Sequence, residues 1–171
     1  FESMANEDDN TLQGKFLAGR LDFHPLGYTP YAQGYFEDTG FTVSLGAYGW
    51  SNDDDVEIGD DTQDVDSVEG IEVSGGLRIA GLSVDAEYNL MQSELKADEF
   101  TGGLYENGET DLETASLKGG YMFVPNTFEV VVGLQNIDAD NYATSWDRYE
   151  LGANWYVREQ NIKFQLALRQ D

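Results

Sequence analysis

Apolar and polar residues alternate with a period of two along most of this chain. Because successive side chains of a β-strand point to opposite faces of a sheet, this period predicts strands, and no segment has the 3.6-residue apolar period of an amphipathic helix. The pattern predicts eight strands, which span residues 12–23, 41–51, 70–79, 82–95, 113–123, 127–137, 148–157 and 162–169.

One face of the predicted strands is apolar, and we call its 37 positions the apolar face. None of them is charged. They are Leu17, Gly19, Leu21, Phe23, Phe41, Val43, Leu45, Ala47, Gly49, Ile71, Val73, Gly75, Leu77, Ile79, Leu82, Val84, Ala86, Tyr88, Leu90, Ala115, Leu117, Gly119, Tyr121, Phe123, Phe128, Val130, Val132, Leu134, Tyr149, Leu151, Ala153, Trp155, Val157, Ile162, Phe164, Leu166 and Leu168.

The opposite face, which we call the polar face, carries twelve charged residues. They are Arg20, Asp22, Glu72, Arg78, Asp85, Glu87, Lys118, Glu129, Arg148, Glu150, Lys163 and Arg169. Lys15, Glu94 and Glu113 share the parity of the apolar face, but each lies at the loop end of its strand.

The connections between the strands alternate in length. Residues 80–81, 124–126 and 158–161 form short turns, whereas 52–69, 96–112 and 138–147 form long acidic loops. The connection 24–40 lies on the short-turn side and is predicted to include a short strand at 31–36.

The net charge of −24 is concentrated in these loops. Residues 1–10 and the three long loops together hold 21 of the 33 acidic residues and one basic residue, Lys96. So large a negative charge repels a polyphosphate and argues against nucleic acid as a partner.

A soluble β-sandwich also alternates apolar and polar positions, so three further features favour a membrane protein. Each strand has four or five apolar positions on one face, the length of a tilted transmembrane strand. Aromatic residues next to the short turns fit an interfacial girdle, and short turns opposite long polar loops fit an outer-membrane protein. The girdle residues are Phe23, Phe123, Phe128, Trp155 and Phe164.

The pattern therefore predicts that residues 1–171 form a single domain or segment of an all-β, antiparallel transmembrane barrel in contact with outer-membrane lipid. Its expected function is passive diffusion of small hydrophilic solutes or ions, without catalysis and without a cofactor. Two alternatives stay open, a structural or adhesive surface barrel whose acidic loops bind a partner or calcium, and a soluble acidic β-sandwich.

Four stretches resemble the phosphate-selective porins of the O and P type, in the same order as in that family. They are Leu12–Gly27, Val43–Tyr48, Gly81–Tyr88 and Tyr149–Tyr156. The resemblance implies a bacterial outer-membrane channel of about sixteen strands, of which this chain is the C-terminal part, and it implies a homotrimer. Phosphate selectivity would require clustered basic residues, because desolvation of an anion must be offset by fixed positive charge. The chain has nine basic residues interspersed with acids, so that selectivity is not expected.

The direction of the strands predicts further strands beyond this chain. With the short turns on the periplasmic side, both ends of the chain would lie outside the cell, whereas bacterial barrels ordinarily keep both termini in the periplasm.

Two segments carry candidate chemistry. The acidic residues Asp53, Asp55, Glu57, Asp60 and Asp61 are candidates for adventitious calcium binding, since carboxylates bind hard cations, but Gly59 does not fit the EF-hand register. A solvated acidic loop is the alternative. His24 is the only histidine, and nothing in its spacing predicts a zinc site or a nucleophilic triad.

Overall fold

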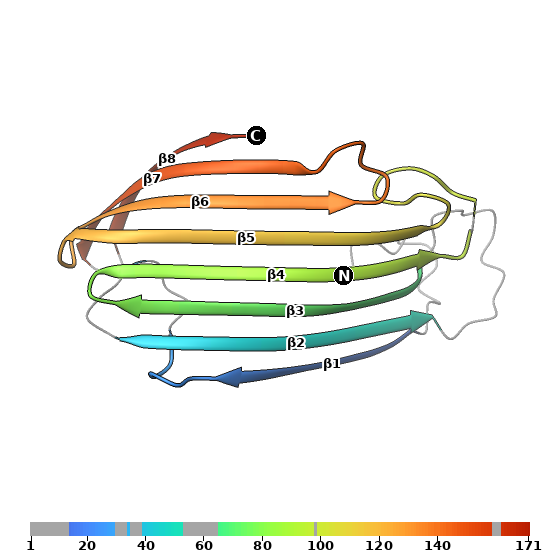
Figure 1. Cartoon of the computed structure of the whole chain (residues 1–171), viewed down its shortest axis with the longest axis horizontal. Coiled ribbons are helices and arrows are strands. Elements are labelled where there is room, and N and C mark those ends of the chain that lie inside the picture. Colours follow the sequence, from blue (N-terminus) through green and yellow to red (C-terminus); the bar gives the residue numbers. More distant parts are fainter. Residues whose placement is uncertain (1–13, 30–33, 35–38, 53–64, 98, 159–161) are drawn as a thin grey trace.

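The structure is a computed structural model that describes residues 14–29, 34, 39–52, 65–97, 99–158 and 162–171. These residues form an all-β fold without helices. The strands lie side by side in a single sheet (Figure 1). They are β1 (Gly14–Phe23), β2 (Gly40–Asn52), β3 (Val65–Ile79), β4 (Leu82–Leu95), β5 (Glu109–Val124), β6 (Phe128–Ala139), β7 (Trp146–Arg158) and β8 (Ile162–Gln170).

The eight predicted strands are confirmed, and so is their antiparallel arrangement. Each strand pairs with its neighbour in the sequence, in the order β1-β2-β3-β4-β5-β6-β7-β8. The sheet is open, because β1 and β8 do not pair with each other in the described part of the chain. The predicted strand at 31–36 lies outside the described residues, apart from Gly34.

The predicted long loops are shorter than their acidity suggested. Strand β3 already begins at Val65, β5 begins at Glu109, and β6 continues to Ala139. The strands therefore extend into acidic sequence, because an exposed strand position can carry a carboxylate in water without breaking its backbone pairing.

The β3–β4 and β5–β6 turns lie at one end of the sheet, together with the longer β1–β2 connection, and the β4–β5 and β6–β7 connections lie at the other, as Figure 1 shows. The tightest turn is Ala80–Gly81, where both residues have positive φ, 50° and 87°. This is the backbone of a type I′ hairpin, whose twist matches that of the strands it joins. We call the two ends of the sheet the short-turn end and the long-loop end.

Burial in the sheet is inverted relative to a soluble protein. Of the 37 positions of the apolar face, 27 are exposed, ten are half-buried and none is buried. Every buried strand residue of the described chain instead belongs to the polar face. Their polar members are Ser44, Arg78, Ser83, Ser93, Thr110, Glu129 and Asn154. A monomeric soluble protein rarely exposes so continuous an apolar surface.

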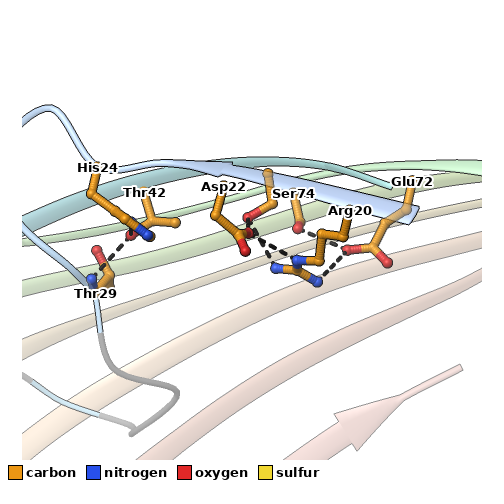
Figure 2. Close-up of polar contacts among 8 residues, drawn as sticks. Arg20, Asp22, His24, Thr29, Thr42, Glu72 and Ser74 are labelled. Atoms are coloured by element: carbon orange, nitrogen blue, oxygen red, sulfur yellow. Dashed lines mark hydrogen bonds and ion pairs between the residues drawn. The ribbon is translucent and has the colours of Figure 1, made fainter. Parts of the chain in front are cut away.

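The sheet curves, and the polar face lies on its hollow side. Figure 1 shows β7 and β8 receding behind the other strands. Figure 2 shows Arg20, Asp22 and Glu72 pointing toward the side to which the later strands bend. Curvature crowds the inner side chains and separates the outer ones, which explains the inverted burial. The described residues contain no second sheet that covers the apolar face.

Candidate functional site

The twelve charged residues identified in the sequence all lie on the polar face, within the eight strands. Ten of them are exposed or half-buried, so they meet the space inside the curve of the sheet. Arg78 and Glu129 are buried instead, with 3% and 1% of their surface exposed. These two side chains hold the sheet together, as their hydrogen bonds indicate.

Arg20 organises the polar face of β1, β2 and β3. Its guanidinium donates to Asp22 at 2.8 Å, to Ser44 at 2.9 Å and to Glu72 at 3.4 Å (Figure 2). Ser44 also donates to Asp22, and Ser74 donates to Glu72 at 2.8 Å. One cation is thus shared between two carboxylates, and this corner of the face keeps a negative charge.

The connection after β1 folds back onto the polar face at the short-turn end. Thr29 is buried there, where its hydroxyl donates to the Gly76 carbonyl at 3.2 Å and its amide donates to the Thr42 hydroxyl at 3.0 Å. His24 Nδ1 lies 2.9 Å from the same hydroxyl (Figure 2). His24 therefore shares the Thr42 hydroxyl with the Thr29 amide, in a contact that holds the connection against β2.

Arg78 bridges the hairpin of β3 and β4. Its Nη2 donates to both Asp85 carboxylate oxygens at 2.9 Å, and its Nη1 donates to the Leu77 and Val84 carbonyls at 2.9 and 3.1 Å. The charge-assisted contacts of Nη2 with Asp85 and of Nη1 with the two carbonyls offset part of the cost of burying the guanidinium. Asp85 is half exposed, at 52%, and faces the open side.

Glu129 on β6 is held by three neutral donors. Ser83 donates to one carboxylate oxygen at 3.0 Å, while Asn154 and Tyr156 donate to the other at 2.8 and 2.6 Å. The side chain reaches Ser83 by crossing β5 at Gly120, where an added Cβ would overlap Glu129 Oε1. The cluster therefore ties β4, β6 and β7 together across Gly120, where a larger residue would displace the Glu129 or Ser83 side chain.

The basic side chains gather on β5, β7 and β8. Lys118, Gly133, Glu150 and Arg169 follow one another across the strands in register. Because Gly133 has no side chain, a hollow of ≈ 160 Å³ opens among Lys118, Arg148, Glu150 and Arg169. Arg169 Nη2 lies 3.7 Å from Glu150.

Arg148 forms an ion pair with Asp171, which follows the end of β8. The hydrogen bond from Arg148 lowers the pKa of the Asp171 carboxyl below its usual range. Asp171 therefore stays ionised, and it offsets part of the positive charge around the hollow.

The connection between β4 and β5 turns toward the polar face at the long-loop end. Ser93 Oγ lies 3.1 Å from the Tyr105 hydroxyl, and Thr110 donates to the Leu104 carbonyl at 2.8 Å. Leu95 and Thr110, which both have the parity of the polar face, are buried beneath this part of the fold. The connection thus extends inward over the hollow side.

The apolar face ends in a different kind of residue at each end of the sheet. At the short-turn end the five predicted girdle aromatics are exposed, and Tyr121 packs against Phe123 with ring centroids 5.0 Å apart. The ring centroids of Trp155 and Phe164 lie 5.7 Å apart. At the long-loop end the same parity carries exposed carboxylates, namely Glu69, Glu94, Glu109, Asp111, Glu113, Asp138 and Asp147.

The candidate calcium residues Asp53, Asp55, Glu57, Asp60 and Asp61 lie outside the described residues. Within the described part of the chain, no group of three or more potential ligands could hold a metal ion. No helix among those residues is long and apolar enough to span a bilayer.

Three features of the face were missed from the sequence. The roles of Gly120 and Gly133 depend on which side chains lie across from them on neighbouring strands, which no local pattern reveals. The third feature, the separation of charge across the sheet, could have been found in the sequence. The acids Asp22, Glu72, Asp85 and Glu87 come from β1–β4, and the bases Lys118, Arg148, Lys163 and Arg169 come from β5–β8. The bases of the polar face are interspersed with acids along the sequence, but four of the six bases lie on β5–β8.

Comparison of the chain with protein-family models, with curated proteins and with solved structures finds no match.

Proposed function

We propose that this chain forms part of the wall of a transmembrane β-barrel in an outer membrane, through which small hydrophilic solutes or ions diffuse passively. The observation that carries the proposal is the inverted burial. A face of 37 uncharged positions without a buried member needs an apolar solvent, and lipid hydrocarbon supplies one. The charged face on the hollow side needs water, which a channel supplies.

The dimensions of the apolar face support this proposal. On β4 it runs from Leu82 to Leu90, nine residues, which is the length that crosses a bilayer in a tilted strand. The exposed aromatics at the short-turn end fit one interface, and the exposed carboxylates at the long-loop end fit the aqueous side of the other.

An open sheet is not a complete barrel, because hydrocarbon cannot satisfy the free backbone groups of β1 and β8. The proposal therefore includes further strands that pair with both edges, in a barrel of about sixteen strands and in a trimer, as the resemblance to the phosphate-selective porins implies. Phosphate selectivity is not part of it, since the twelve strand charges of the polar face comprise six acids and six bases.

The two alternatives find less support. A soluble sandwich requires a second sheet against the apolar face, and the described residues form one sheet. An adhesive barrel whose acidic loops bind a partner would use the long-loop end, but it gives no reason for ten exposed or half-buried charges on the hollow side.

The protein reconstituted in planar lipid bilayers is expected to give stepwise conductance with a weak preference for cations. Fixed negative charge on the outer connections raises the cation concentration at the channel mouth within a Debye length, about 8 Å at physiological salt and about 3 Å at 1 M. Reversal potentials across a KCl gradient should therefore show a preference that fades as the salt concentration rises.

Glu99 and Glu106, which are exposed on the β4–β5 connection, allow a test of whether the loop carboxylates cause the cation preference. Replacement of both by glutamine should reduce the cation preference without changing conductance in high salt. Absence of conductance would refute the channel, whereas anion preference that persists in high salt would refute the electrostatic assignment alone.

A further inference from the structure

The charges of the polar face are separated laterally across the sheet. The six on β1–β4 have a net charge of −2, and the six on β5–β8 have a net charge of +2. The ion pair of Arg148 with Asp171 removes one positive charge from the second half and leaves the sign unchanged. The hollow side is thus bounded by an acidic half and a basic half.

Part of this charge is available to a solute. Glu87 on β4 is exposed and accepts a hydrogen bond from the neutral amide of Asn89 at 2.7 Å. Lys118 on β5 is exposed at the rim of the hollow above Gly133. Among the described residues, no ion pair includes either side chain. The register places Asp85 opposite Lys118 and Glu87 opposite Ser116, so the boundary between the halves runs between β4 and β5.

The acidic corner at β1–β3 carries the separation to the far edge of the sheet. There Arg20 serves both Asp22 and Glu72, so one of the two carboxylates lacks a full countercharge. Figure 2 shows these side chains projecting into the hollow side, toward which the later strands curve. A solute inside the curve therefore has negative charge on one side and positive charge on the other.

From this arrangement we propose that the polar face selects small zwitterionic solutes, with the ammonium group toward the Glu87 side and the carboxylate toward the Lys118 side. This inference rests on the proposed channel function. A zwitterion is attracted electrostatically by both halves, whereas a monovalent ion is attracted by one half and repelled by the other. A neutral solute gains from neither half.

Swelling of proteoliposomes tests the inference with two isomers of equal composition, zwitterionic β-alanine and neutral lactamide. β-Alanine is expected to enter about two- to fivefold faster than lactamide at low salt, since exposed charge pairs contribute modestly in water. The ratio should fall toward one at high salt, because the interactions are screened.

Lys118→Gln and Glu87→Gln should each lower this ratio, and the double variant should bring it close to one. Lys118→Arg keeps the charge and should keep the ratio, and all variants should leave lactamide entry unchanged, which separates a lost charge from a damaged channel. Equal entry of both isomers into wild-type vesicles, or an unchanged ratio in both glutamine variants, would overturn the inference while the channel stands. Entry of neither isomer above protein-free vesicles would overturn the channel itself.

Discussion

Replacement of Leu45 or Val132 by arginine is expected to lower the free energy of unfolding in lipid vesicles by about 2–4 kcal/mol. Both side chains belong to the apolar face and are half exposed, at 52% and 53%. If that face meets hydrocarbon, the guanidinium must leave water, whereas in a face that meets water the same change costs little. Urea titrations of the refolded protein in vesicles measure the difference.

Glu87→Arg is the matched control, because Glu87 is an exposed strand residue of the polar face. We expect it to change the free energy of unfolding by less than about 1 kcal/mol, as surface charges in water do. Equal tolerance of arginine at Leu45, Val132 and Glu87 would contradict the assignment of the apolar face to lipid.

The second large effect is expected at Gly120, where alanine should lower the free energy of unfolding by about 2–4 kcal/mol. The new methyl group would occupy the path of the Glu129 side chain and displace its carboxylate from Ser83, Asn154 and Tyr156. Buried polar groups that lose their partners account for the size of the effect. The same urea titration measures it.

Gly119→Ala is the control for this prediction. An added Cβ there meets only Val132 Cγ2 at an ordinary 3.7 Å, so we expect a change within about 0.5 kcal/mol. In a Glu129→Ala background, Gly120→Ala should lose most of its cost, because the displaced side chain is gone. An equal cost in both backgrounds would show that Glu129 is not the reason for the glycine.

The strands and their two faces were predictable because a period of two fixes both at once. A shift of one residue would move Leu45 and the other apolar residues of β2 to the charged side, so the pattern excludes such a shift. The strand ends were less predictable. Glu109 and Asp111 were assigned to a loop for their charge, yet they belong to β5, where their side chains are exposed beyond the apolar stretch.

The contacts within the polar face were predictable only as a set of candidates. Sequence parity places Glu129 on that face, but its burial follows from Gly120 on β5 and from Asn154 on β7, which lie on neighbouring strands. Parity likewise does not reveal that Thr29 folds back onto Gly76. Such contacts depend on register between strands and on the path of a connection, and neither is written in a single segment.

The strictly sequential strand order also has a consequence for how such a protein changes in evolution. Because every strand pairs with its neighbour in the chain, each hairpin is a self-contained unit, and none of the eight described strands inserts between two others that are adjacent in sequence. Duplication or loss of a hairpin would leave the remaining pairings intact and would present an edge of the same alternating character. If the sheet belongs to a closed barrel, as we propose, the circumference of that barrel would grow or shrink by two strands at a time, while the residues of the retained strands would keep their neighbours.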